Sequence, residues 1–508
     1  MSFPYQCLSP LGQGTIFAAS KGTSIHTFDL SANPQLLSSW THPSSKLTGT
    51  GEKTAANGNA MGQEVGDGPP SKRRKVEGED EVAADEVDIV PESHGTAANE
   101  GKTTVNEGKK KKINRKANWA LQSSEAPYVI LLTATEDGSH VVAVTGQDKT
   151  LWVFEHDGKG SLEELSQRVM PKRPCSLAFS ADGQTILSAD KFGDVYALPL
   201  ITAPEPEAVI TPGSTPAPNT TSQTLHGANS FTVHSGRNRR ALEHQQRQRE
   251  ANKSQDATKE GPSFTHELLL GHVSLLTCVI SAKDTQGRPY IITGDRDEHI
   301  RVSRGMPQAH VIQTYCLGHS SFVNALCLPQ PEILVSGGGD NELFVWDWLA
   351  GRLLSTVDLL ARVHEVTPDA CKIAVVKLCV WETDGGRYII AICEKVPALF
   401  SFKLQDNKLL PVQTFQTAGN ALDIMAINTK ILVSIDSDDS LLILTQSNGI
   451  LAPETTTLKD PTAVEVPAIS REDLDKVLYT VENLRKGRDD AGEADESGAA
   501  GTPDPGQV

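Results

Sequence analysis

A short pattern recurs along the chain, with 43 or 44 residues between three pairs of successive copies, and it constrains the fold more than any other feature. Each copy has an apolar strand, a glycine or another small residue, a short polar turn and a second apolar strand. The first apolar residue after the turn shifts by 44 residues from Leu151 to Val195, and by 43 from Ile300 to Leu343. Such a period is typical of four-stranded units that bury their apolar faces by stacking on one another. The seven copies, of which the first is the weakest, are 16–30, 141–155, 185–200, 291–304, 333–348, 389–404 and 431–445.

Two copies carry more specific marks. Gly318-His319 precedes the copy that contains Trp346-Asp347, and Gly271-His272 precedes the copy before it. With the period, these marks resemble the WD-repeat β-propeller family. The resemblance implies an all-β fold, a seven-bladed WD-repeat β-propeller, here with long disordered insertions and a short C-terminal helix. The resemblance also implies that His319 and Asp340 join a hydrogen-bond network that ties a turn to a strand. A catalytic pairing is disfavoured, because no nucleophile accompanies them.

Three segments interrupt the period, and they are rich in glycine, alanine, proline or charge. None has enough apolar surface to offset the entropy of ordering it, so we expect long loops and a tail. The predicted order is a first blade at 1–40, a charged insertion at 41–115, blades 2 and 3 at 116–200, an insertion at 201–262, blades 4–7 at 263–450, a segment with a helix at 451–487 and an acidic tail at 488–508.

The segment SREDLDKVLYTVENLRK, residues 470–486, predicts a helix. Ser470 is a suitable N-cap, and Asp473 follows three residues later. The helix packs either on its own propeller or on a partner, and the sequence leaves both open. Its apolar stripe consists of Leu474, Val477, Leu478, Val481 and Leu484.

Composition and motifs argue against an enzyme or a generic nucleic-acid binder. The net charge of −17 is opposite to the basic field that phosphate binding requires. The eight cysteines form no CxxC pair, so we expect buried thiols in a reducing compartment rather than zinc ligands or disulfides. GTGEKT at 49–54 lacks the spacing of a phosphate-binding loop, and no nucleophile–base pair, metal set or cofactor motif is recognisable. The chain shows no signal peptide and no apolar run of the ~18 residues that span a bilayer, so we expect a soluble intracellular protein.

Three basic clusters lie in the insertions. Lys72, Arg73, Arg74 and Lys75 resemble a nuclear localisation signal, which predicts a nuclear protein, with a solubilising linker as the alternative. The clusters at 109–116 and 237–249 could contact RNA phosphates or be simply solvated.

The turn of the fourth copy is unusually charged. Residues 295–304 contain six acidic or arginine side chains within ten positions. Because Ile300 and Val302 point into the core between blades, we expect Arg301 to face away from it. Arginines held by neighbouring carboxylates suit a directional salt bridge to a partner.

The same stretch carries a second resemblance. GDRDEHIRVS at 294–303, followed by CLGH at 316–319 and Phe322-Val323, is similar to the WD-repeat non-catalytic subunit of the eukaryotic, fungal-type tRNA (guanine-N7-)-methyltransferase. The resemblance implies that this chain binds no cofactor and forms a heterodimer. Its partner would be a Rossmann-type catalytic subunit that uses S-adenosylmethionine to methylate a guanosine in the tRNA variable loop, with tRNA bound through the complex and no membrane involved.

The partner-facing residues implied by this resemblance are Arg296, Asp297, Glu298, His299 and Arg301, of which Arg301 is the strongest candidate. His299 stands where many relatives have lysine. The competing hypothesis is a generic WD-repeat scaffold, such as a ubiquitin-ligase adaptor or a chromatin-associated peptide reader, that binds peptides at the mouth of the central channel.

Overall fold

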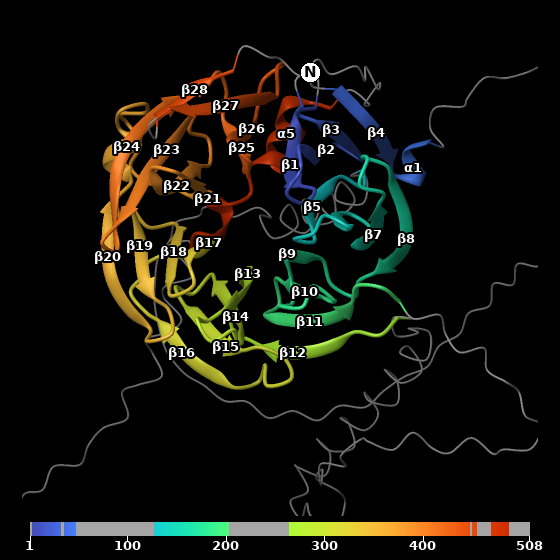
Figure 1. Ribbon diagram of the computed structural model, residues 1–508, viewed down its shortest axis with the longest axis horizontal. Coiled ribbons are helices and arrows are strands. Elements are labelled where there is room, and N and C mark those ends of the chain that lie inside the picture. Colours follow the sequence, from blue (N-terminus) through green and yellow to red (C-terminus); the bar gives the residue numbers. More distant parts are fainter. Residues whose placement is uncertain are drawn as a thin grey trace, which may run out of the picture. The chain divides into compact units, whose positions relative to one another are not determined.

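Seven four-stranded antiparallel sheets follow one another around a ring, so the predicted seven-bladed propeller is confirmed (Figure 1). The computed structural model describes residues 3–31, 35–46, 126–202, 264–447, 450–454 and 469–486. Most of the two predicted insertions, the nuclear localisation signal at 72–75, the other two basic clusters and the acidic tail lie outside these ranges.

The blades follow the order of the chain. Blade 1 has β1 (Tyr5–Pro10), β2 (Ile16–Lys21), β3 (Ser24–Asp29) and β4 (Gln35–Thr41), and blade 2 has β5 (Val129–Ala134), β6 (His140–Thr145), β7 (Thr150–His156) and β8 (Leu162–Val169). Blade 3 has β9 (Pro174–Phe179), β10 (Thr185–Asp190), β11 (Asp194–Pro199) and β12 (Glu267–Gly271), and blade 4 has β13 (Leu276–Lys283), β14 (Pro289–Asp295), β15 (Ile300–Arg304) and β16 (Ile312–Cys316). Blade 5 has β17 (Val323–Gln330), β18 (Ile333–Gly338), β19 (Glu342–Asp347) and β20 (Arg352–Asp358). Blade 6 has β21 (Val375–Thr383), β22 (Gly386–Cys393), β23 (Ala398–Gln405) and β24 (Lys408–Gln416), and blade 7 has β25 (Ala421–Ile427), β26 (Lys430–Ile435), β27 (Leu441–Ser447) and β28 (Ile450–Pro453). The helical elements are α1 (Pro43–Lys46), α4 (Leu360–Val363), α5 (Arg471–Leu478) and the short 3-10 helix η1 (Glu482–Leu484).

The outer strand of blade 3 lies after the second insertion, which corrects the predicted boundary at 263. β12 pairs with β11, with Asp194 opposite Gly271 and Val195 opposite Leu270. The insertion therefore falls inside blade 3, between its third and fourth strands. The Gly-His mark Gly271-His272 stands at the end of β12, which is the outer strand of blade 3. The sequence repeat therefore starts at this outer strand, one strand before blade 4 starts.

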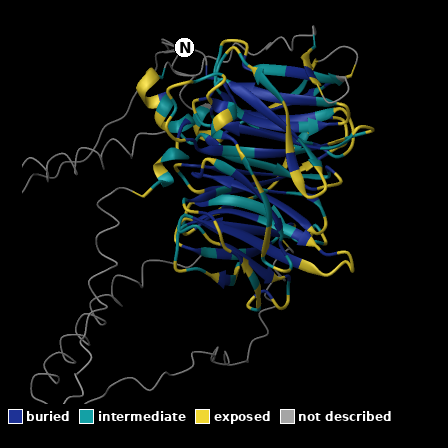
Figure 2. Cartoon of the chain, turned by 90° about the vertical axis from the view of Figure 1, so that its left-hand side faces the viewer, coloured by how far each residue is buried: buried dark blue, intermediate teal, exposed yellow. Residues whose placement is uncertain are grey.

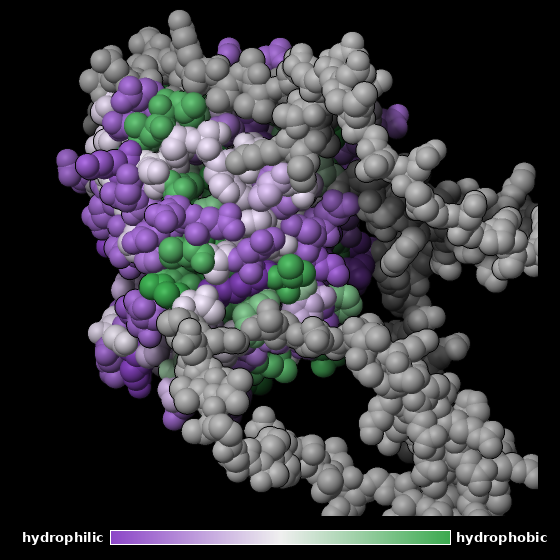
Figure 3. Space-filling model, turned by 90° about the vertical axis from the view of Figure 1, so that its right-hand side faces the viewer, coloured by the Kyte–Doolittle hydropathy of each residue, from purple (hydrophilic) through white to green (hydrophobic). Residues whose placement is uncertain are grey.

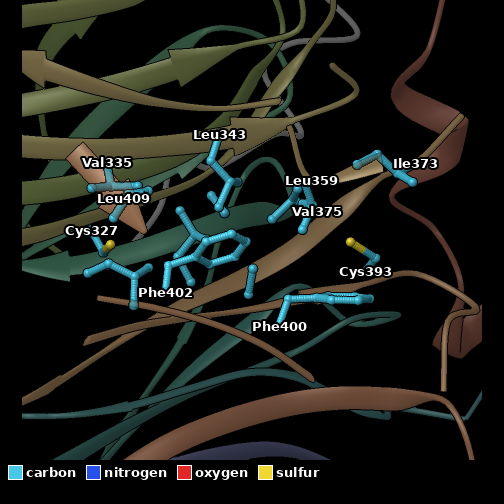
Figure 4. Packing of buried hydrophobic residues seen from close by; sticks show 14 of the residues in the cluster. Cys327, Val335, Leu343, Leu359, Ile373, Val375, Cys393, Phe400, Phe402 and Leu409 are labelled. Atoms are coloured by element: carbon cyan, nitrogen blue, oxygen red, sulfur yellow. The ribbon is translucent and has the colours of Figure 1, made fainter. Parts of the chain in front are cut away.

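The middle strands of each blade are buried on both faces. In β26, Ile431 and Val433 belong to the core between blades 6 and 7, whereas Leu432 belongs to the core between blades 7 and 1. Figure 2, a view from the side, shows buried strands in the middle of the propeller and exposed residues mainly at the turns. In the core between blades 5 and 6, Val335 and Leu343 pack with Phe400 (Figure 4). Burial on both faces explains why the middle strands read as apolar runs rather than as alternating patterns.

Blades 7 and 1 close the ring without sharing a strand. The backbone N–H of Leu8 donates to the buried carboxylate of Asp423 at 2.7 Å, and Leu8 packs in one cluster with Met425 and Leu432. The closure thus consists of side-chain packing and a small number of hydrogen bonds.

Five of the eight cysteines are buried, as the sequence predicts, whereas Cys371 is exposed. Burial raises the pKa of the Cys316 thiol to about 12, so this thiol is protonated at neutral pH. Within the described ranges, no helix has the length and apolar character to cross a membrane.

Candidate functional site

The charged turn between β14 and β15 is built around Asp295. One carboxylate oxygen of Asp295 accepts the backbone N–H groups of Asp297, at 2.8 Å, and His299, at 3.0 Å. The other oxygen lies 3.5 Å from Nδ1 of His299. Burial raises the pKa of Asp295, and these bonds offset only part of that effect. A buried carboxylate therefore fixes the backbone of the turn and leaves its other side chains on the surface.

The predicted C-terminal helix begins where the sequence indicates, and it packs on its own propeller. The backbone N–H of Asp473 donates to the Ser470 hydroxyl at 3.2 Å, which caps α5. The helix is shorter than predicted, because Tyr479 leaves the helical conformation. The Tyr479 hydroxyl donates to Asp436 at 2.5 Å and accepts from the Asn420 amide at 2.9 Å. These bonds to blade 7 replace the next helical turn.

We call residues 469–486 the C-terminal strap. Beyond α5, the Glu394 carboxylate of blade 6 accepts the backbone N–H groups of Val481, at 2.7 Å, and Glu482, at 2.9 Å. Val481 and Leu484, which the sequence places on one helical stripe, instead flank or lie in η1. In Figure 1 the strap is the red segment that runs from α5, beside β25, toward β17.

Arg485 anchors the end of the strap. Its guanidinium donates to the carbonyl oxygens of Gly339, at 2.8 Å, and Ile373, at 2.7 Å, and lies over the ring of Phe322 at 5.4 Å. Both Nε and Nη2 also donate to the Glu482 carboxylate. The strap is therefore attached to blades 7, 6 and 5 in succession.

The strap ends on the charged turn of blade 4. Nε of Arg296 donates to the carbonyl of Leu484 at 2.8 Å. Nζ of Lys486 lies 3.0 Å from a carboxylate oxygen of Asp297 and 3.7 Å from one of Glu298. The bond to Asp297 raises the pKa of Lys486, so its ammonium group is charged at neutral pH. A pocket of about 380 Å³ lies between this end of the strap, the turn and blade 5.

Arg301 does not lie on the surface, which corrects the expectation from the sequence. Its side chain is only 8% exposed, and its Nε and Nη1 donate to the Ser303 hydroxyl and the Gly271 carbonyl, each at 3.0 Å. In the described part of the chain, no carboxylate pairs with it. Because side chains alternate along β15, Arg301 lies on the other face of the sheet from Ile300 and Val302. That face packs against blade 3, where Arg301 bonds to Gly271, and does not meet water.

The structure therefore brings four of the five predicted residues to one exposed corner and places the fifth beneath them. Arg296, Asp297 and Glu298 are partly exposed and bonded to the strap. His299 is the most exposed of the four, with 49% of its side chain accessible, and its ring lies edge-on to Tyr315 at 6.5 Å. The contribution of the strap could not be foreseen, because 484 and 486 are distant from the turn in the sequence.

The predicted structural network of blade 5 is confirmed. His319 lies 2.7 Å from both Asp340 and Ser336, and the indole N–H of Trp346 donates to Ser336 at 2.8 Å. These bonds tie the loop before the blade to its middle hairpin, which is a structural role.

Blade 2 has a second network of the same kind, which the sequence analysis missed. His42 lies 3.2 Å from Asp148, which accepts from Thr145, and Trp152 donates to Thr145 at 3.1 Å. The first insertion separates His42 from the other three residues, so no Gly-His mark precedes the blade. Among the residues that the structure describes, no group of three acidic, histidine or cysteine side chains could hold a metal ion.

Comparisons with known proteins agree with this architecture. The family model of the tRNA methyltransferase TRM82 WD40 domain matches residues 16–449. The chain is 40% identical to the tRNA (guanine-N(7)-)-methyltransferase non-catalytic subunit trm82 of Sclerotinia sclerotiorum, over 90% of this chain and 87% of that protein. It is 38% identical to the TRM82 subunit of Coccidioides immitis, over 83% and 80%. It is also 30% identical to that of Saccharomyces cerevisiae, over 56% and 55%. The names of these relatives favour a non-catalytic subunit over a general peptide-binding scaffold.

Proposed function

We propose that this chain, which belongs to the family of the tRNA methyltransferase TRM82 WD40 domain, binds and stabilises a catalytic tRNA (guanine-N7-)-methyltransferase. The chain itself is a non-catalytic subunit. In this proposal it forms a heterodimer with the S-adenosylmethionine-dependent enzyme and is required for N7-methylguanosine in the tRNA variable loop. tRNA is held through the complex rather than by this acidic chain alone.

The observation that carries the proposal is the ordered charged corner of blade 4. Asp295 fixes its backbone from below, and the strap holds Asp297 and Glu298 from one side. A surface whose charged groups are already oriented loses little entropy when a partner binds, so it favours specific association. A scaffold that bound peptides only at the mouth of the central channel would not require an ordered charged turn on blade 4.

The proposed contact residues differ from the initial prediction in one respect. Arg296, Asp297, Glu298 and His299 remain candidates for direct contact. Arg301 becomes a supporting residue, because its guanidinium is already bonded beneath the turn.

The test is a charge reversal at the corner. The double variant Asp297→Lys/Glu298→Lys should bind the purified catalytic subunit at least about tenfold more weakly, since oriented charges at an interface are replaced by their opposites. Its melting temperature should change little, because exposed ion pairs contribute about 0–1 kcal/mol. The matched control is Glu382→Lys, which reverses an exposed acid paired with Arg387 on blade 6. Equal binding by the double variant and the control would refute the corner as the interface.

A further inference from the structure

The three most exposed large apolar side chains of the described residues are all found near the charged corner. Val273 is fully exposed, and Phe192 and Leu317 are 68% and 61% exposed. On the side of the ring that carries β4 and β8, exposed apolar side chains form small separate groups among polar residues (Figure 3). Isolated apolar residues are ordinary on a protein surface, but three largely exposed apolar side chains that flank an oriented charged turn are less usual.

Backbone contacts place the three residues around the corner. The N–H of Arg296 donates to the carbonyl of Leu275 at 2.9 Å, so the loop that carries Val273 lies against the charged turn. The N–H of His272 donates to the carbonyl of Gly193 at 2.7 Å, which brings Phe192 next to Val273.

Leu317 lies on the other side of His299. β15 and β16 are antiparallel, with Arg301 opposite Tyr315 and Ile300 opposite Cys316. Extending this register by one residue places Leu317 opposite His299, on the same face as Tyr315. The strap bonds to Arg296, Asp297 and Glu298, whereas Phe192, Val273 and Leu317 remain largely exposed.

We propose that Phe192, Val273 and Leu317 form an apolar anchor for the catalytic subunit, continuous with the charged corner. We call these three residues the apolar anchor. This inference rests on the proposed function and extends its surface from blade 4 onto blade 3. The surface that fits is an apolar pocket of a folded protein, bordered by polar groups that meet His299 and the neighbouring carboxylates. Interfaces of this kind combine a few apolar anchors, which supply most of the affinity, with a charged rim that sets orientation.

The experiment measures the affinity of the full-length chain for the purified catalytic subunit by calorimetry. Phe192→Asp and Val273→Asp should each weaken binding by roughly 30-fold, as expected for a central contact residue, and a variant with all three positions changed to Asp should abolish measurable binding. Because the side chains are exposed, melting temperatures should stay within about 2 °C of the unmodified chain. Ile450→Asp is the matched control, since Ile450 is 55% exposed on the outer strand of blade 7. Its affinity should be unchanged.

The outcomes separate this inference from the proposed function. If the charge reversal at Asp297 and Glu298 weakens binding but the apolar-anchor variants bind like Ile450→Asp, the apolar anchor is wrong and the proposed function stands. If neither set weakens binding by a chain that does bind the catalytic subunit, the charged corner and the apolar anchor are both wrong as the interface. If the unmodified chain does not bind the catalytic subunit at all, the proposed function is wrong. If light scattering shows that the unmodified chain dimerises through this surface, while the variants are monomeric with unchanged affinity for the catalytic subunit, the surface serves a second copy and the inference is overturned.

Discussion

The ammonium group of Lys486 lies 3.0 Å from the carboxylate of Asp297, so the end of the C-terminal strap forms an ion pair with the charged turn of blade 4. The turn is therefore shaped both by its own blade and by a segment that follows the last blade in the sequence. Changes in the strap should consequently affect a surface to which they are not adjacent in sequence.

Arg485→Ala should destabilise the protein by about 1–3 kcal/mol, because it leaves the carbonyls of Gly339 and Ile373 without their charged donor. Urea denaturation measures this, and Arg485→Lys should recover only part of the loss. Lys476→Ala, on an exposed part of the same strap, serves as the control and should be close to neutral. Equal stability of the Arg485 and Lys476 variants would show that the strap is not anchored at Arg485.

Arg301→Ala should also destabilise the protein, by about 2–4 kcal/mol, because it removes a buried side chain and its bonds to Ser303 and Gly271. Any loss of partner binding should then follow the loss of folded protein. Thermal melting and binding should be measured on the same samples. A variant with normal stability and no binding would restore Arg301 as a direct contact residue.

His272 should make the protein sensitive to mild acid. Burial, together with the nearby Arg301, lowers the pKa of His272 to about 4. The unfolded chain, with a histidine pKa of about 6.5, takes up a proton first as the pH falls. Stability should therefore be retained above pH ~6.5 and decrease toward pH ~4, by about 2–3 kcal/mol from this group. In His272→Gln the decrease over this interval should be smaller by that amount. Denaturation curves at several pH values test this, and identical pH profiles would contradict it.

Nuclear accumulation should depend on Lys72, Arg73, Arg74 and Lys75, a proposal that rests on the sequence alone. A fluorescent fusion with these four residues changed to alanine should spread into the cytoplasm. The control changes Lys109, Lys110, Lys111 and Lys112 instead and should remain nuclear. If the second variant redistributes and the first does not, the signal lies at 109–112.

The sequence predicted the blades well, because strands buried on both faces leave apolar runs at a regular period. It also located the start of α5, since Ser470 and Asp473 act over a single turn. It did not predict the position of Arg301, because alternation distinguishes two faces of a strand but does not say which of them meets water. Nor did it predict the strap's contacts with Glu394 or Asp297, which join residues that no local pattern connects. The structure thus places Arg296, Asp297, Glu298 and His299 together at the predicted turn, but it buries Arg301, the strongest candidate of the prediction.

The closure between blades 7 and 1 has a consequence for how the protein folds. The bond from Leu8 to Asp423 joins residues 415 positions apart, so it can form only after the intervening blades have brought the two ends together. Contacts of such long range slow folding, because the entropy of closing the chain is lost before the contact stabilises it. Six blades can stack in order as the chain is made. The apolar face of blade 1 that packs against blade 7 stays exposed until blade 7 has formed. The first blade to be synthesised is thus the last to be completely buried, and during that interval its apolar face is open to misassociation.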